Sequence, residues 1–180
     1  MKWNSWQTPL GLFLVSVIVS PAWAQVAPQA GIINYVEGQS SIGRQVLDES
    51  SAGSVRLRAG QSLTTQNGRA EVLLTPGVFF RIGHNSSVDM ISPDLANTIL
   101  LLQKGRALVE VIDIRSQNDI RIDENGASTK LLKNGLYEFD ADHAQVRVFK
   151  GNAEATMANQ KVTLGENHEV TLSVGVKLKS

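Results

Sequence analysis

The chain has 180 residues, with 17 basic and 17 acidic side chains and no cysteine. This charge balance gives no electrostatic reason to expect nucleic acid or an anionic membrane surface as a partner. The lack of cysteine excludes disulfide bonds and a lipid-acylated cysteine, so we expect packing and sheet hydrogen bonds to stabilise the fold.

The N-terminus has the pattern of an export signal. Lys2 precedes an apolar run from Leu10 to Val19, and Pro21–Ala24 offers a cleavage site of small residues. This run of ten residues is about half of the roughly 20 needed to span a bilayer, which favours cleavage over an uncleaved anchor. We predict a signal peptide at residues 1–24, cleaved after Ala24, and a periplasmic or extracellular protein without a membrane span.

Residues 25–30 are predicted to form a spacer and residues 31–180 a single β domain. The signal peptide contains one basic residue and no acidic one, so 156 residues with 16 basic and 17 acidic groups remain. That length suits one ordinary domain with a core. Apolar residues recur at every second position between Gly, Asn, Asp and Ser, which predicts an all-β fold with almost no helix.

The first predicted strands, residues 33–36 and 40–42, would form a hairpin around Gly38. Asn67-Gly68 is a candidate turn before the next strand. Pro76-Gly77 suits a type II turn, because Pro presets φ at the first central position and Gly accepts a positive φ at the second. Beyond it, Arg81 is predicted to point outward.

Further along the chain, only residues 93–97 suit a helical turn. Residues 107–114 are apolar on both faces, which predicts a central strand covered on two sides. Asn134-Gly135 has the sequence of a type I′ hairpin turn, in which both central residues need a positive φ. A last hairpin is expected around residues 165–168, followed by a lysine-guarded edge strand at 176–179.

Two patterns recur along the chain. The Asn-Gly pair, paired leucines and glycine of residues 67–77 recur at residues 125–135, at a constant offset of 58. A second pattern places a charged residue before each of Gly38, Gly105 and Gly151, and we expect each glycine to take a positive φ in a tight hairpin bend. Repeated hairpins predict one β-sandwich, jelly-roll-like or short solenoid-like domain.

The sequence predicts neither catalysis nor a cofactor. His84, His143 and His168 are far apart, without the spacing of a metal site. Residues 140–143 are interpreted as a solvated loop, and residues 123–126 as a turn that lacks the ligand ladder of an EF-hand. There is no nucleophile elbow of the Gly-x-Ser-x-Gly type and no phosphate-binding glycine loop.

Arginine side chains recur on predicted strands and turns, where solvated strand faces are the plainer interpretation. Arg69, Arg81 and Arg106 are the candidates for a partner-binding surface. The aromatic residues fit a core better than a sugar-stacking platform; these are Tyr35, Phe79, Phe80, Tyr137 and Phe139.

Four segments carry a resemblance to a known family: Ala59–Thr65, Gly68–Leu74, Pro76–Ser86 and Leu102–Ala107. Together they resemble the FecR-like periplasmic domain, over roughly residues 31–151. The resemblance implies an all-β, non-catalytic extracytoplasmic domain. The best known members are transmembrane regulators that relay the state of an outer-membrane receptor to a sigma factor. This chain differs in its cleavable apolar run and in lacking an anti-sigma segment before that run, so we do not expect direct sigma-factor signalling.

Three classes of function follow. The favoured one is an exported, non-catalytic module that binds an envelope protein or a polysaccharide such as peptidoglycan. The alternative is a sensory or regulatory domain of an envelope signalling system with a retained N-terminal anchor. The third is an enzyme, such as a metal-dependent hydrolase. The identity of the partner and the oligomeric state are left open by the sequence.

Overall fold

The computed structural model describes residues 29–173, so the predicted signal peptide, most of the spacer and the tail at 174–180 lie outside the described residues. Within that range no helix is long and apolar enough to cross a membrane. A short 3-10 helix, η1 (Glu49–Ser51), accompanies the strands. The strands are β1 (Ile32–Ile42), β2 (Gln45–Leu47), β3 (Ser62–Thr75), β4 (Val78–Ile82), β5 (Ser87–Asp94), β6 (Asn97–Lys104), β7 (Arg106–Val111), β8 (Ile120–Glu124), β9 (Ala127–Leu131), β10 (Gly135–Asp140), β11 (Gln145–Lys150), β12 (Ala153–Met157), β13 (Gln160–Leu164) and β14 (His168–Thr171).

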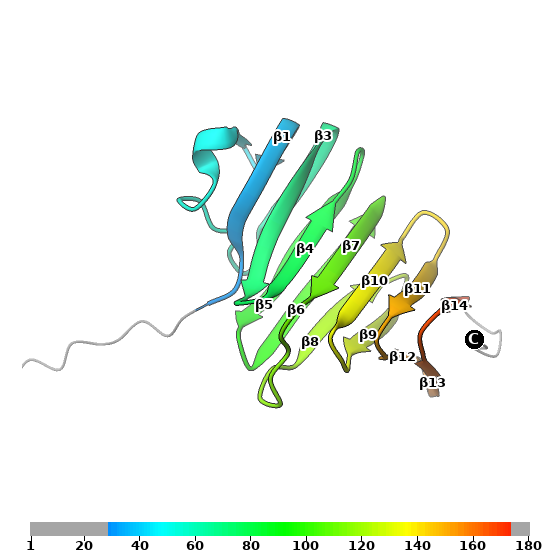
Figure 1. Cartoon of the computed structure of the whole chain (residues 1–180). Helices are drawn as coiled ribbons and strands as arrows, with labels where there is room; N and C mark the ends of the chain where they lie inside the picture. The colour runs from blue at the N-terminus through cyan, green and yellow to red at the C-terminus, as the bar shows by residue number, and fades with distance from the viewer. Residues whose placement is uncertain (1–28, 174–180) are drawn as a thin grey trace, which may run out of the picture.

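These strands form one 14-stranded sheet that folds over on itself along β3. Residues 62–64 of β3 pair with β5, whereas residues 70–75 pair with β4. The front layer in Figure 1 consists of the second half of β3 together with β1, β4, β7, β10, β11 and β14. β5, β6, β8, β9, β12 and β13 form the back layer. The all-β prediction is confirmed, and the architecture is a barrel-like sandwich.

The core lies between the two layers because side chains alternate across each strand. β4 and β8 show this directly, with buried residues at every second position. Phe80, Tyr137 and Phe139 are fully buried in the front layer, as predicted for core aromatics. Each large apolar side chain buried in this way stabilises the fold by about 1.5–3 kcal/mol.

Tyr137 also links two crossings between the layers. Its buried hydroxyl lies 2.5 Å from the carbonyl oxygen of Lys133, which belongs to the β9–β10 connection. It also accepts a hydrogen bond from the backbone N–H of Asn152, at 3.2 Å, in the β11–β12 connection. One side chain therefore satisfies backbone groups from two connections that are distant in sequence.

The predicted hairpin at Gly38 and the predicted turn at Asn67-Gly68 are wrong. Both glycines lie within long strands, β1 and β3, and are register partners of each other. Gly38 has a φ of +68° beside a β-bulge. A Cβ on Gly68 would lie 2.5 Å from the carbonyl oxygen of Glu37. These glycines permit close contact between two backbones and do not reverse the chain.

Gly105 and Gly151 take the expected positive φ, at +78° and +99°, but they do not sit in hairpins. Gly105 follows β6 in the back layer and precedes β7 in the front layer, and Gly151 connects β11 to β12 in the opposite direction. At both glycines the chain crosses from one layer to the other. Pro76-Gly77 does connect two paired strands, β3 and β4, with Gly77 at +86°.

The type I′ prediction at Asn134-Gly135 is wrong, because neither residue is among those with positive φ. β9 pairs with β8 and β12, whereas β10 pairs with β7 and β11, so this connection is another crossing. A Cβ on Gly135 would lie 2.0 Å from the carbonyl oxygen of Lys150, which is the steric reason for glycine. The segments at offset 58 are therefore not equivalent: Asn67-Gly68 lies within a strand, while Asn125-Gly126 forms the β8–β9 turn.

Three further predictions need correction. Residues 93–97 form the end of the β5–β6 hairpin, not a helical turn. β13 and β14 pair with β12 and β11, so they do not form a hairpin with each other. β7 is buried on only one face, because its other face forms part of the outer surface of the front layer.

Candidate functional site on the outer face of the front layer

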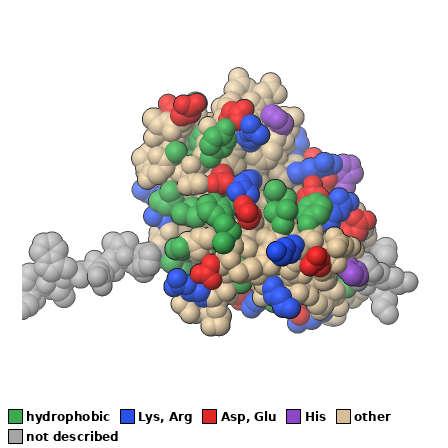
Figure 2. Space-filling model, in the orientation of Figure 1, with side chains coloured by type: hydrophobic (Ala, Val, Ile, Leu, Met, Phe, Trp, Pro, Cys, Tyr) green, Lys and Arg blue, Asp and Glu red, His purple; other side chains and the backbone are tan. Residues whose placement is uncertain are grey.

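One row of side chains crosses the outer face of the front layer. Register partners on successive strands, from β1 to β14, are Tyr35, Glu71, Arg81, Leu108, Glu138, Arg147 and Glu169. Opposite charges on neighbouring strands attract one another across the sheet. Figure 2 shows this face, on which acidic and basic side chains are interspersed with hydrophobic ones.

Arg81 is at the centre of the ion pairs on this face. Its guanidinium lies 2.5 Å from Glu71 and 2.8 Å from Glu110, and its Cζ lies 5.7 Å from the centre of the Phe79 ring. Partial burial disfavours the charged form, but hydrogen bonds to Glu110 and Glu71 outweigh it, so the pKa of Arg81 is raised. Arg81 is therefore a positively charged side chain that two carboxylates hold in place on this face.

A hollow opens beside this row, where β4 ends and β7 begins. Its volume is about 460 Å³, and we call it the Gly83 hollow. An added Cβ at Gly83 would meet no atom within 4 Å, so the missing side chain leaves open space. The hollow is lined by Tyr35, Arg69, Ala70, Glu71, Arg81, Ile82, Gly83, Arg106, Ala107, Leu108 and Glu138. All three arginines predicted as a partner surface thus line one hollow.

Glu37 holds one wall of the hollow in place. Its Oε2 accepts hydrogen bonds from the Tyr35 hydroxyl and from Nε of Arg69, each at 2.6 Å. The hydrogen bond from Tyr35, and after it that from Arg69, lowers the pKa of Glu37. The hydrogen bond between Tyr35 and Glu37 raises the pKa of Tyr35. Tyr35 is 46% exposed, so it is not the core residue that the sequence predicted.

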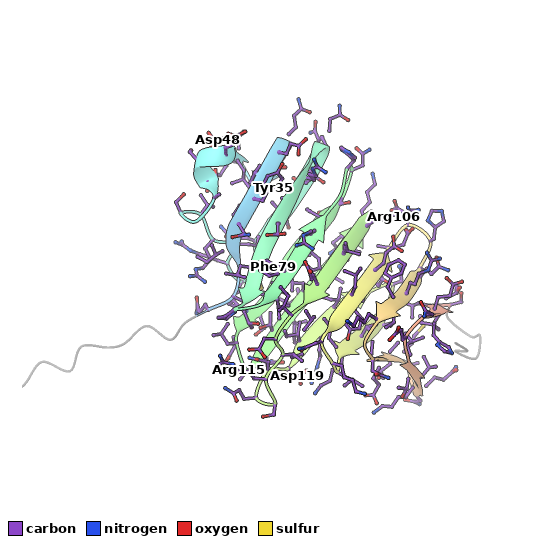
Figure 3. The ribbon with its side chains drawn as sticks, in the orientation of Figure 1. Tyr35, Asp48, Phe79, Arg106, Arg115 and Asp119 are labelled. Atoms are coloured by element: carbon purple, nitrogen blue, oxygen red, sulfur yellow. The ribbon has the colours of Figure 1, made fainter. Side chains whose placement is uncertain are left out.

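Asp140 holds the opposite wall through Arg106. Its Oδ2 accepts from Nε of Arg106 at 2.7 Å and lies 3.0 Å from Nδ1 of His143. Burial opposes the charged form of Asp140, but hydrogen bonds from His143 and Arg106 outweigh it and lower the pKa. Asp142 fixes the start of β7, the strand of Arg106, by accepting a hydrogen bond from the backbone N–H of Gly105 at 3.0 Å. Figure 3 shows Tyr35 and Arg106 on the same face.

The histidines and acidic loops do not form a metal centre in the part of the chain that the structure describes. No group of three or more His, Asp or Glu in residues 29–173 is arranged to hold an ion. His84 is exposed in a turn and His168 is exposed at the start of β14, while residues 141–144 form the loop between β10 and β11. The loop interpretation agrees with the structure at residues 141–143 but is wrong for Asp140, which is the buried last residue of β10.

Sequence reasoning missed Gly83, Leu108 and Glu138. Leu108 lies in the segment predicted to be covered on both faces, and no prediction singled out Gly83 or Glu138. The available signal was the alternation of Arg81 with Gly83 and of Arg106 with Leu108, which puts all four on one face if β4 pairs with β7. That pairing joins strands separated by a complete hairpin in the back layer, so local sequence could not reveal it.

Comparison with known proteins bears on the fold. A scan of protein-family models and a search of curated proteins each found no match. Two solved structures of a "putative anti-sigma factor" from Parabacteroides distasonis ATCC 8503, at 2.50 and 1.65 Å resolution, are similar to this chain, each with a TM-score of 0.54. The fold is shared. The identities are 16% and 15%, and the match covers 66% of this chain. The chain spans 57% of the length of those proteins, so the likeness concerns the fold alone.

Proposed function

We propose that this protein is an exported, non-catalytic β module that binds a protein of the cell envelope through the Gly83 hollow and the row beside it. The observation that carries the proposal is the hollow itself. Exposed Tyr35 and two exposed arginines surround open space on the outer face of the front layer. Tyrosine and arginine, together with tryptophan, are enriched at the energetic centres of protein interfaces.

The surroundings of the hollow also suit protein docking. Leu73, Phe79 and Leu136 lie in the next row along the strands, and Phe149 on β11 is 37% exposed. Apolar and aromatic side chains beside paired charges resemble the mixed composition of a non-obligate interface. Because β-sheet faces are rigid, the partner would meet a preformed surface.

Photo-cross-linking tests this proposal in cells that produce the protein. A photoreactive amino acid at Leu108 borders the hollow, whereas one at Thr163 lies on the outer face of the back layer, opposite Glu154. Cross-linking of Leu108 to one defined protein, without the same product from Thr163, would support docking at this face. A Leu108 variant that gives no adduct, or gives the same adduct as Thr163, would contradict it.

A second candidate is a regulatory domain of an envelope signalling system that keeps its N-terminal segment as an anchor. The shared fold with a "putative anti-sigma factor" favours this class. Mass spectrometry of the mature N-terminus separates the two candidates. A chain that begins at Gln25 would contradict the anchored version, and a retained N-terminus would contradict the exported, cleaved version.

A further inference from the structure

The two most exposed charged side chains at the Gly83 hollow are arginines. The side chains of Arg69 and Arg106 are 61% and 62% exposed. The carboxylate that holds Arg106, Asp140, is only 8% exposed, and Glu71 beside Arg81 is 12% exposed. Glu37 beside Arg69 is 51% exposed, so Arg106, whose paired carboxylate is buried, offers an entering ligand the least shielded guanidinium of the hollow.

The arginines are also oriented to accept a second partner. Asp140 engages Arg106 through Nε, which leaves the two terminal nitrogens of the guanidinium fork able to face another acceptor. Glu37 similarly holds Arg69 through Nε and one terminal nitrogen. Exposed ion pairs of this kind are weak, so a ligand can share the guanidinium groups at little cost.

Gly83 leaves room for that ligand. The register between β4 and β7 continues to Gly83 and Arg106, whose backbones are joined by an N–H···O bond of 3.1 Å. On the other side, Arg69 precedes Ala70, the register partner of Ile82. The open position at Gly83 therefore lies between two arginine-bearing strands, and Arg81 is on the same face.

We propose that the Gly83 hollow binds a carboxylate group from an acidic segment of the partner protein. A carboxylate between two guanidinium groups gains charge-assisted hydrogen bonds, and arginine is well suited to planar, two-pronged contact with it. The apolar side chain of Leu108 in the lining favours a peptide over an acidic sugar polymer. This inference rests on the proposed docking function and names the chemistry of the partner.

NMR titration of the isotopically labelled protein tests this inference with three probes. The first is a capped hexapeptide in which glutamate alternates with valine, the second is the same peptide with glutamine, and the third is trigalacturonate. The glutamate peptide should shift the backbone amide signals of Arg69, Gly83 and Arg106, with binding at least about tenfold tighter than that of the glutamine peptide.

Two variants and one control localise the effect. Gly83→Leu should fill the hollow and abolish the shifts, and Arg106→Gln should weaken binding about tenfold, the loss expected for one charge-assisted hydrogen bond. Arg121→Gln, which removes an arginine paired with Asp119 on the back layer, should leave the titration unchanged.

Equal shifts with the glutamine peptide, no shifts with the glutamate peptide at millimolar concentration, or an unaltered titration in Gly83→Leu would each overturn the carboxylate assignment. Tighter binding of trigalacturonate than of the glutamate peptide would overturn the assignment to a protein segment. If the titration fails while Leu108 still cross-links to a protein, the docking function survives and only its chemistry is wrong.

Discussion

Gly38 and Gly68 face each other across the β1–β3 pair, so that two glycines form one backbone contact. A Cβ on Gly38 would lie 2.2 Å from the carbonyl oxygen of Asn67, and one on Gly68 would lie 2.5 Å from that of Glu37. Neither distance is compatible with a side chain unless the strands separate. The contact precedes Arg69 directly and follows Glu37, so it also places the ion pair that forms one wall of the hollow.

Gly68→Ala is therefore expected to destabilise the protein by about 1–3 kcal/mol, as overpacking does in a close-packed interior. Gly83→Ala is the matched control, because an added Cβ there meets open space. It should change the free energy of unfolding by no more than about 0.5 kcal/mol. Denaturant unfolding of both variants measures the difference, and equal stabilities would show that the β1–β3 contact has been misplaced.

Two other glycines should differ in what can replace them. Gly77 needs its positive φ of +86°, so Gly77→Asn should cost less than Gly77→Val, because Asn tolerates the left-handed region. Gly135 is required for a steric reason and not for its φ, since the carbonyl oxygen of Lys150 is 2.0 Å from the position of an added Cβ. Gly135→Asn and Gly135→Val should therefore both cost more than about 1 kcal/mol. Thermal unfolding that shows rescue by Asn at Gly135 would contradict the steric explanation.

Tyr137→Phe should cost about 1–3 kcal/mol, because it removes a buried hydroxyl that bonds partly buried backbone groups of two connections. Tyr35→Phe is the natural control, since Tyr35 is exposed and its hydroxyl contacts only a surface carboxylate among the bonds described for it. Its cost should stay within about 0.5 kcal/mol. Urea unfolding of the two variants gives the comparison, and similar losses would mean that the Tyr137 bonds contribute little.

Glu124 predicts a pH dependence of stability. It is fully buried at the end of β8, and neither of its carboxyl oxygens has a hydrogen-bond partner within residues 29–173. Burial, assisted by the charge of Asp140, raises the pKa of Glu124 from 4.5 to about 8. The native state thus holds a proton that the unfolded chain releases above pH 4.5. The stabilisation is complete below that pH and is lost as pH rises through about 8, at up to about 1.4 kcal/mol per pH unit.

Glu124→Gln lacks this titration, so its stability relative to the parent protein should rise by about 2–4 kcal/mol between pH 5.5 and 8. Glu166→Gln, at an exposed turn, controls for general charge effects and should show no such trend. Chemical unfolding across this pH range measures both. A parallel pH dependence for Glu124→Gln and the parent would contradict the burial of the carboxyl group.

Local sequence predicted the class of fold well and its connections poorly. Alternation of apolar residues and the Pro76-Gly77 turn are local features, and both agree with the structure. A glycine between two strands, however, is equally consistent with a hairpin, a bulge or a crossing between layers. What distinguishes Gly38, Gly105 and Asn134-Gly135 is how the strands on either side of each one pair. That pairing depends on contacts distant in sequence.

The candidate site could be predicted only in part, for the same reason. Arg69, Arg81 and Arg106 could be selected as exposed strand residues, but their convergence depends on β3, β4 and β7 being adjacent. Glu124 was missed because a carboxyl group next to a turn is normally solvated, whereas here the strand alternation directs it inward. Gly83 was missed because its role is the space that it leaves open.

The most direct test of the central claim is cross-linking from Leu108 in a Gly83→Leu background. Open space at Gly83 predicts that the variant folds with a free energy of unfolding within about 0.5 kcal/mol of the parent, while the leucine occupies the hollow. We predict loss of the Leu108 adduct in this folded variant. An undiminished adduct would show that the partner docks elsewhere and that the Gly83 hollow is not its site.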